Sequence, residues 1–131
     1  MTIGKAIYTL LVTDGTISAA VGNRIYPDMA AQQATFPFIV YQVIGNVPTD
    51  TKDGTSKLDS VRVQIDTYAN TYTSAQDISD RVRVVCDRHT GETSGVMIDS
   101  IRYDNEMNLG PDMDQHVFGV SQEYVIRTKR T

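Results

Sequence analysis

The hydrophobic positions follow two different periods along the chain, and the periods predict helices and strands in turn. The first apolar set recurs at helical spacing and consists of Ile3, Ile7, Leu10 and Leu11. This spacing predicts an amphipathic helix over residues 3–12. After the Asp14-Gly15 break, residues 16–21 can form one further helical turn, which Gly22 closes in a left-handed conformation. Residues 23–36 are expected to form a loop.

Strand-like patterns follow this loop. Residues 38–44 are apolar on both faces and predict a first strand. Residues 61–66 alternate between apolar and polar side chains, which predicts a half-buried second strand. Between them, residues 45–60 are expected to be a long polar connection, with a tight turn at Asp53-Gly54.

The second half of the chain repeats the order of helix and two strands. Thr73 and Gln76 have the spacing of a capping box, and the apolar stripe that follows predicts a helix to about Arg88. Residues 96–103 predict a third strand and residues 117–127 a fourth, in which Gln122 interrupts the apolar row. Residues 104–115 are expected to be an acidic, turn-rich link.

This order predicts an α+β fold in one domain that spans residues 1–131. Strands joined as hairpins pair antiparallel, so we expect a two-layer, helix-strand-strand-helix-strand-strand arrangement. It has a four-stranded, largely antiparallel sheet with two helices on one face. The opposite face is expected to carry two rows side by side, Ile39, Tyr41 and Val43 next to Arg62, Gln64 and Asp66. Such a mixed face predicts burial against another subunit.

Composition narrows the class of protein. A length of 131 residues fits one domain, and a net charge of −4 disfavours a dedicated nucleic-acid binder. The single cysteine, Cys86, excludes an intrachain disulfide. No run approaches the ~18 apolar residues of a membrane span, and the N-terminus lacks the long apolar region of a signal peptide. We therefore expect a protein used or assembled in a cytoplasm, without a membrane partner.

The residues that most often carry catalysis or bind metals are few. His89 lies at the end of a predicted helix, where a cation interacts favourably with the helix dipole. A metal site that combined His116 with Asp112 or Asp114 would still lack the three or four placed ligands that zinc requires. Cys86 falls on an apolar helix face and is expected to pack there as a small hydrophobe. No nucleophile elbow, phosphate loop or dinucleotide motif occurs, so we predict no catalytic residue, no metal and no cofactor.

Charge is segregated along the chain. Between Glu92 and Asp114 there are six acids against one base, Arg102, without the spacing of a calcium loop. The C-terminal stretch from Arg127 to Arg130 is basic. Complementary patches at separate places on one protomer suit a head-to-tail contact, which closes into a ring when the rotation allows.

Three segments resemble a known family. They are AIYTLLVTDGTISAAVGNRIYPDMAAQQATFPFIVYQ, VRVQIDTYANTYTSAQDISDRVRVVCD and HVFGVSQEYVIR. Together they are similar to the tail-completion, or tail-terminator, proteins of long-tailed bacteriophages and related prophage particles. The pair G-x-R-I-Y-P and F-P-F-I-V-Y-Q is the most specific part. The residues that form this family-motif scaffold are Gly22, Arg24, Ile25, Tyr26, Pro27, Phe36 and Pro37.

The motif residues suit a fixed connection better than a ligand loop. Pro27 and Pro37 restrict their own φ and extend the residue before them. The Arg24 guanidinium can bind a carboxylate or a backbone carbonyl. We expect it to bind within the chain, and a contact with another subunit is the alternative.

The resemblance implies a non-enzymatic virion component of the tail, assembled in the host bacterial cytoplasm. Such proteins form a hexameric ring at the head-proximal end of the tail, where they stop growth of the tail tube and present a surface for head joining. The implied partners are further copies of the chain, the tail-tube protein and a head-completion or connector protein. DNA passes through without specific binding, which an acidic chain favours. The candidate lumen or rim acids are Asp104, Glu106, Asp112 and Asp114.

Contacts with neighbours are expected from the polar connection and from the open sheet face. The candidate residues are Asp50, Lys52, Asp53, Lys57, Tyr41, Arg62 and Gln64. Other functions stay open at this stage. The chain could be a head-completion or connector protein, or a small-ligand or nucleic-acid-binding α+β module. The net acidity and the lack of a basic, aromatic platform on residues 61–66 argue against nucleic-acid binding, and the missing motifs argue against a hydrolase.

Overall fold

The computed structural model describes residues 3–28, 35–51, 54–112 and 117–129, and it describes side chains except those of residues 46–51, 54–58, 110–112 and 129. The elements in chain order are α1 (Ile3–Thr13), α2 (Gly15–Val21), β1 (Ile25–Pro27), β2 (Phe38–Thr51), β3 (Gly54–Ala69), α3 (Tyr72–Cys86), β4 (Gly91–Thr93), β5 (Val96–Asp112) and β6 (Val117–Lys129).

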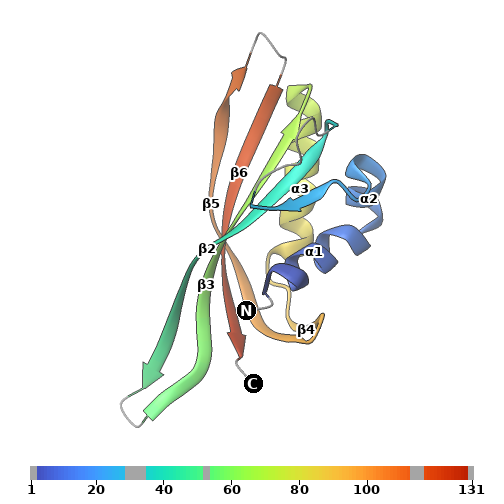
Figure 1. Ribbon diagram of the computed structural model, residues 1–131. Helices are drawn as coiled ribbons and strands as arrows, with labels where there is room; N and C mark the ends of the chain where they lie inside the picture. The colour runs from blue at the N-terminus through green and yellow to red at the C-terminus, as the bar shows by residue number, and fades with distance from the viewer. Residues whose placement is uncertain (1–2, 29–34, 52–53, 113–116, 130–131) are drawn as a thin grey trace.

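The strands form one sheet of six in the order β1-β2-β3-β6-β5-β4. β1 pairs parallel with β2, and the other pairs are antiparallel. All three helices lie on one face of this twisted sheet (Figure 1). The α+β prediction is therefore confirmed, whereas the four-stranded sheet and the two helices are wrong in number. The four predicted strands are the long ones, β2, β3, β5 and β6.

The two strands that the sequence did not predict are short. β1 occupies part of the expected loop at 23–36, and it pairs with β2 through Ile25 and Ile39. β4 folds back on β5 through a turn at Ser94 and Gly95, whose φ angles are 49° and 79°. Each strand has three residues, which is too short for an alternating pattern to show.

Both long hairpins extend much further than predicted. β2 continues to Thr51, β3 starts at Gly54 and β5 continues to Asp112, so most of the expected connections at 45–60 and 104–115 are strand. The hairpins project beyond the helical layer at opposite ends of the molecule (Figure 1). Strand segments outside the covered face need no apolar row, which explains why their polar sequences predicted loops. The expected Asp53-Gly54 turn begins at a residue outside the described ones.

The core lies between the helices and the covered sheet face. Fully buried side chains of this core come from the helices and from the strands. They include Ala6, Ile7, Leu11, Ile17, Val21, Ile39, Val61, Val63, Ile65, Val82 and Ile126. Burial of such side chains is the main favourable term in folding. The helical and strand periods of the sequence therefore meet in one cluster.

Gln122 is a polar residue in this core and explains the interrupted apolar row. It is fully buried, and its amide nitrogen donates to the Ser79 carbonyl and to Glu106 Oε1, at 2.9 Å each. Its amide oxygen accepts a hydrogen bond from the Tyr124 hydroxyl at 3.2 Å. A buried amide is tolerated when its donors and acceptors are paired, so this contact ties α3 to β5 and β6.

The start of α3 differs from the prediction by two residues. The N-cap is Thr71, whose hydroxyl accepts a hydrogen bond from the Ser74 amide at 3.1 Å. The predicted cap, Thr73, lies inside the helix, and Gln76 donates to the Asn108 side chain at 3.0 Å instead of closing a capping box. The local sequence offers two threonines for the cap, Thr71 and Thr73, and the structure uses the first.

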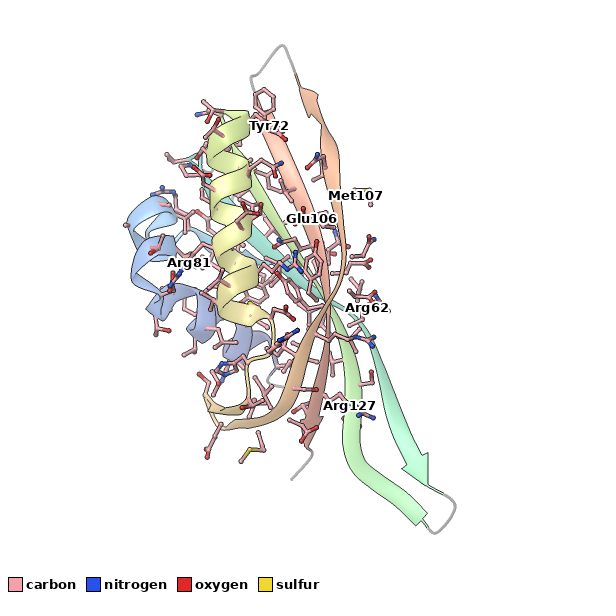
Figure 2. All side chains as sticks on the ribbon, turned by 180° about the vertical axis from the view of Figure 1, so that it is seen from behind. Arg62, Tyr72, Arg81, Glu106, Met107 and Arg127 are labelled. Carbon is pink, nitrogen blue, oxygen red and sulfur yellow. The ribbon has the colours of Figure 1, made fainter. Side chains whose placement is uncertain are left out.

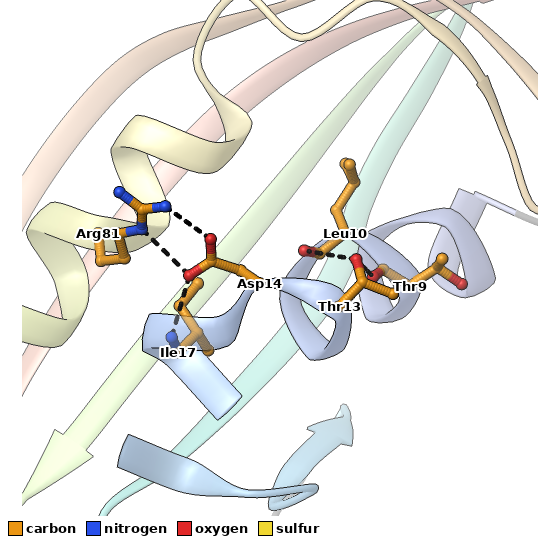
Figure 3. A network of polar contacts seen from close by, with 6 residues as sticks. All are labelled: Thr9, Leu10, Thr13, Asp14, Ile17 and Arg81. Carbon is orange, nitrogen blue, oxygen red and sulfur yellow. Dashed lines mark hydrogen bonds and ion pairs between the residues drawn. The ribbon is translucent and has the colours of Figure 1, made fainter. Parts of the chain in front are cut away.

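Asp14 joins the first two helices to the third (Figure 3). As the N-cap of α2 it accepts a hydrogen bond from the Ile17 amide at 3.0 Å. The Arg81 guanidinium of α3 binds both of its carboxylate oxygens, at 2.7 and 3.1 Å. Thr13 ends α1 beside it by donating to the Thr9 carbonyl at 2.6 Å. The hydrogen bond from Arg81 lowers the pKa of Asp14 below its ordinary value.

We expect Asp14→Ala to lower the free energy of unfolding at neutral pH by about 1–2 kcal/mol, mainly through the lost cap. A carboxyl with a lowered folded-state pKa stabilises the protein above its unfolded value of 3.8, and loses that contribution as the pH falls through the folded pKa. The difference between wild type and variant should therefore shrink in acid. Urea unfolding at several pH values measures it, with Asp77→Ala, an exposed acid of α3, as the control. A difference that stayed constant from pH 7 to pH 2 would contradict the role of the charge.

Candidate interaction surface

The register of β2 against β3 decides which residues share the face that the helices leave uncovered. Tyr41 pairs with Ile65, and Ile39 pairs with Thr67, so these side chains point toward the helices. Tyr41 is only 8% exposed and belongs to the core. The predicted row of Ile39, Tyr41 and Val43 beside Arg62 is therefore wrong, and Tyr41 is not an exposed contact residue. Sequence alternation gives two faces for each strand but not their match between strands.

The uncovered face instead joins the opposite rows of the strands. β2 contributes Phe38, Val40 and Gln42, which lie opposite Tyr68, Asp66 and Gln64 of β3. The Gln64 amide donates to both carboxylate oxygens of Asp66, at 3.1 and 3.0 Å. The face is thus apolar at one end and polar along its middle.

The apolar end is packed within the chain. The Phe38 ring lies 5.3 Å from Tyr68, 5.0 Å from Phe36 and 6.1 Å from Tyr26, between ring centroids. Gly119 packs against Tyr68 of this cluster and leaves no room for a side chain, since an added Cβ would lie 3.2 Å from Tyr68 Cδ1 and 2.9 Å from Leu109 Cδ1. Aromatic rings of the same chain therefore cover this end of the uncovered face.

The other end of the face gathers arginines from three adjacent strands. Arg62, Val125 and Arg102 lie on one level across β3, β6 and β5, and Arg127 lies on the next level. A hollow of about 470 Å³ lies here. It is lined by Ser60, Ser100, Arg102, Val125 and Arg127. Figure 2 shows Arg62 and Arg127 on the side of the sheet away from the helices.

One carboxylate serves two of these arginines. Arg62 Nη1 lies 2.6 Å from Asp104 Oδ2, and Arg102 Nη2 lies 3.7 Å from Asp104 Oδ1. The hydrogen bond from Arg62 lowers the pKa of Asp104. From the sequence, Arg102 is a lone base among acids and Arg127 is part of the basic C-terminal stretch, because the cluster forms only through strand register. Each of these two arginines follows a buried apolar residue, Ile101 or Ile126, and that alternation was the one available signal.

The four candidate acids do not share one surface. Asp104 lies at a bulge of β5 and pairs with Arg62 on the uncovered face. Glu106 binds Gln122 on the helix side, and Figure 2 shows it pointing toward α3. The backbone of Asp112 pairs with Val117 at the end of β5. Asp114 lies outside the described residues.

The predicted contact residues of the β2–β3 hairpin are placed only in part. Asp50 pairs with Thr55 near the hairpin end, and Lys57 belongs to β3. Lys52 and Asp53 lie outside the described residues. Arg62 and Gln64 lie on the uncovered face, as described above.

The family-motif scaffold forms a continuous path from α2 to β2. Gly22 has a φ of 63° at the end of α2, and Ile25 is buried in the core. Arg24 Nε donates to the Pro37 carbonyl at 3.0 Å, and its Nη2 donates to the Ala20 carbonyl at 3.4 Å. The Ile39 amide donates to the Arg24 carbonyl at 3.0 Å. The bonds of Arg24 therefore hold two distant turns of its own chain together.

The described cysteine and histidine side chains, Cys86 and His89, are buried or hydrogen-bonded within the chain. Cys86 is buried, and burial raises the pKa of its thiol to about 12. His89 Nε2 lies 3.1 Å from the Thr93 hydroxyl, while His116 is outside the described residues. Within the described ranges, no group of three or more His, Cys, Asp or Glu side chains could hold a metal ion. The helices in these ranges include none long and apolar enough to cross a membrane.

The fold and its surfaces define a small α+β protein whose exposed features are two projecting hairpins and an open sheet face. The sequence matches the family model described as "Tail completion protein gp17" over residues 5–129. The chain therefore belongs to the phage tail-completion family, which confirms the resemblance found in the sequence.

Solved structures share the fold at low sequence identity. A chain of the structure titled "Virion of native gene transfer agent (GTA) particle" matches with a TM-score of 0.75 and 13% identity, covering 95% of this chain and 92% of that chain. A second solved chain matches with a TM-score of 0.62 and 12% identity, covering 98% of this chain and 94% of that one. No curated protein matches the sequence.

We expect Arg24→Ala to lower the free energy of unfolding by about 0.5–1.5 kcal/mol, the usual net value of one intramolecular hydrogen bond. Arg24→Lys should recover only part of the loss, because an ammonium lacks the planar fork that reaches two carbonyls. Chemical denaturation measures both, with Lys5→Ala on the exposed side of α1 as the matched loss of a cation. Unchanged stability together with lost assembly would instead assign Arg24 to a contact between subunits.

Proposed function

We propose that this chain acts as a ring, six copies in number, that caps the head-proximal end of a phage-type tail tube. The ring stops tail polymerisation and provides the surface to which the head joins. The family match over residues 5–129 carries this proposal, and the likeness in fold to a chain of a gene transfer agent virion is consistent with it.

The architecture supports a role in which one protomer meets different partners at different ends. The β2–β3 and β5–β6 hairpins project from opposite ends of the sheet (Figure 1). In a ring of like-oriented protomers, every β2–β3 hairpin would lie on one side and every β5–β6 hairpin on the other. One side would then contact the tail-tube protein and the other a head-completion or connector protein.

The proposed action is structural and needs no catalysis. A bound ring covers the end face to which the next tube subunit would add, so growth stops by occlusion. DNA would pass through the ring without specific binding, and a net charge of −4 limits attraction to its phosphates. Of the candidate acids, Asp104 lies on the uncovered face, where it is paired with Arg62, whereas Glu106 binds Gln122 on the helix side.

Particle-producing cells that lack this chain should make tails of uncontrolled length that stay unjoined to filled heads. Electron microscopy of the lysate measures tail length and joining, and the wild-type gene supplied in trans should restore both. Tails of normal length that fail only to join would favour a connector role. Complete, joined particles in the absence of the chain would contradict the proposed function.

A further inference from the structure

Two edges of the sheet are covered only along part of their length. β1 pairs with residues 39–41 of β2, and β4 pairs with residues 96–98 of β5. The cover on β5 continues for a few residues, because the Arg88 amide donates to the Ile101 carbonyl at 2.7 Å and the Tyr103 amide donates to Asp87 Oδ1 at 3.0 Å. Within the described part of the chain, no further strand flanks β2 after Tyr41 or β5 after Tyr103.

The uncovered lengths carry features of strands that await a partner. An open edge presents unpaired backbone N–H and C=O groups, which proteins usually blunt with charges, proline or short length. Here apolar side chains lie on both open edges: Val43 and Ile44 are each 42% exposed on β2, and Met107 is 56% exposed on β5. Figure 2 shows Met107 pointing away from α3. Within β2 and β5, proline, which lacks the N–H, appears only at Pro48 and Pro111, so residues 42–47 and 104–110 keep their backbone donors. Each length contains a register shift near its start, between Val43 and Gly45 in β2 and between Tyr103 and Asn105 in β5.

Strand direction makes the two open edges compatible. β2, β3, β6 and β5 follow one another across the sheet, and each neighbouring pair is antiparallel. β2 and β5 therefore run in opposite directions. When a second copy with the same orientation lies beside the first, its β5 meets β2 as an antiparallel neighbour, which continues the sheet without a break in its pattern.

Charge selects this head-to-tail contact over pairing of like edges. Residues 104–112 of β5 contain three acids and no base, namely Asp104, Glu106 and Asp112. Pairing of two β5 edges would place the acidic lengths of two copies side by side, and like charges across an interface are unfavourable. The described residues of the other hairpin end, 42–51 of β2 and 54–57 of β3, contain one acid, Asp50, and one base, Lys57. The acidic edge therefore fits the neutral one.

The positions of the open edges also suit a closed ring. Gln42 of β2 and Asn105 of β5 lie on one level across the sheet, through Gln64 and Glu123. From that level the two open lengths extend in opposite directions. They meet fully only if neighbouring copies are offset along the strands, and tilted strands in a closed barrel impose such an offset.

We propose that residues 42–47 of β2 in one copy pair antiparallel with residues 104–110 of β5 in the next copy, so that one sheet runs from copy to copy. The occupant of each open edge is thus a second copy of this chain. The inference rests on the proposed ring and adds which surfaces join its subunits. It also places the uncovered faces of successive copies on one continuous surface.

Cysteine crosslinking in purified particles tests this pairing in the assembled state. One cysteine is introduced by Ile44→Cys, and a second by a scan over Asn105, Glu106, Met107, Asn108 and Leu109, one at a time. The native Cys86 is buried with a pKa raised to about 12, so it gives little background. Mild oxidation is followed by electrophoresis without reductant, and head-to-tail bonds in a ring appear as a ladder of covalent oligomers.

Strand pairing predicts a specific pattern across the scan. One position should crosslink most, positions two residues away should crosslink less, and adjacent positions should fail because their side chains point to the other face. The control pair combines Ile44→Cys with Val84→Cys, which is 66% exposed on α3, and it should give no ladder. A ladder from the control pair but not from the scan would overturn the edge pairing.

The outcomes separate the inference from the function on which it rests. Particles that contain the variants in a ring at the tail end, yet show no crosslink at any scanned position, would overturn the edge pairing and leave the ring intact. Particles that contain none of the wild-type chain would overturn the proposed function and the edge pairing together. Each single-cysteine variant should give at most a dimer, which checks that the ladder needs both edges.

Discussion

The pairing of β3 with β6 is the contact on which the rest of the structure depends. It runs without a register shift from Leu58 opposite Lys129 to Ala69 opposite Phe118. It joins two hairpins that are distant in sequence into one sheet, and so gives the helices a single face to cover. Its register also brings Arg62 of β3 to the level of Arg102 of β5, and thereby creates the arginine cluster of the uncovered face.

The interface between the helices and the sheet is mainly apolar, and a few polar contacts fix the position of the helices on it. Asp14 holds α2 and α3 together, and Gln122 ties α3 to the central strands. Arg24 holds the turn after α2 to the residue before β2. These contacts lie on the covered side or at its rim, so they orient the protomer without occupying the open face or the hairpin ends. The surfaces left over are those that an assembly protein needs for its partners.

The sequence predicted the parts of the fold in which periodicity is strong. Helices α1 and α3, the central lengths of the four long strands and the burial of Cys86 follow from apolar spacing. The hairpin ends failed because polar residues in a projecting strand look like a loop. The position of Tyr41 failed for another reason: alternation does not reveal which rows meet across a hairpin, and a shift of one residue reverses the faces.

The candidate surface was predictable only through its family. The motif around Arg24 and Pro37 carried the resemblance, yet those residues bind one another within the chain. The arginine cluster and the open edges of β2 and β5 arise from register and strand length, which no local pattern contains. Locating this chain in finished particles tests the central claim most directly. A gold-labelled tag on the chain should mark one site per particle, at the junction of tail and head, and labels spread along the tail would contradict the account.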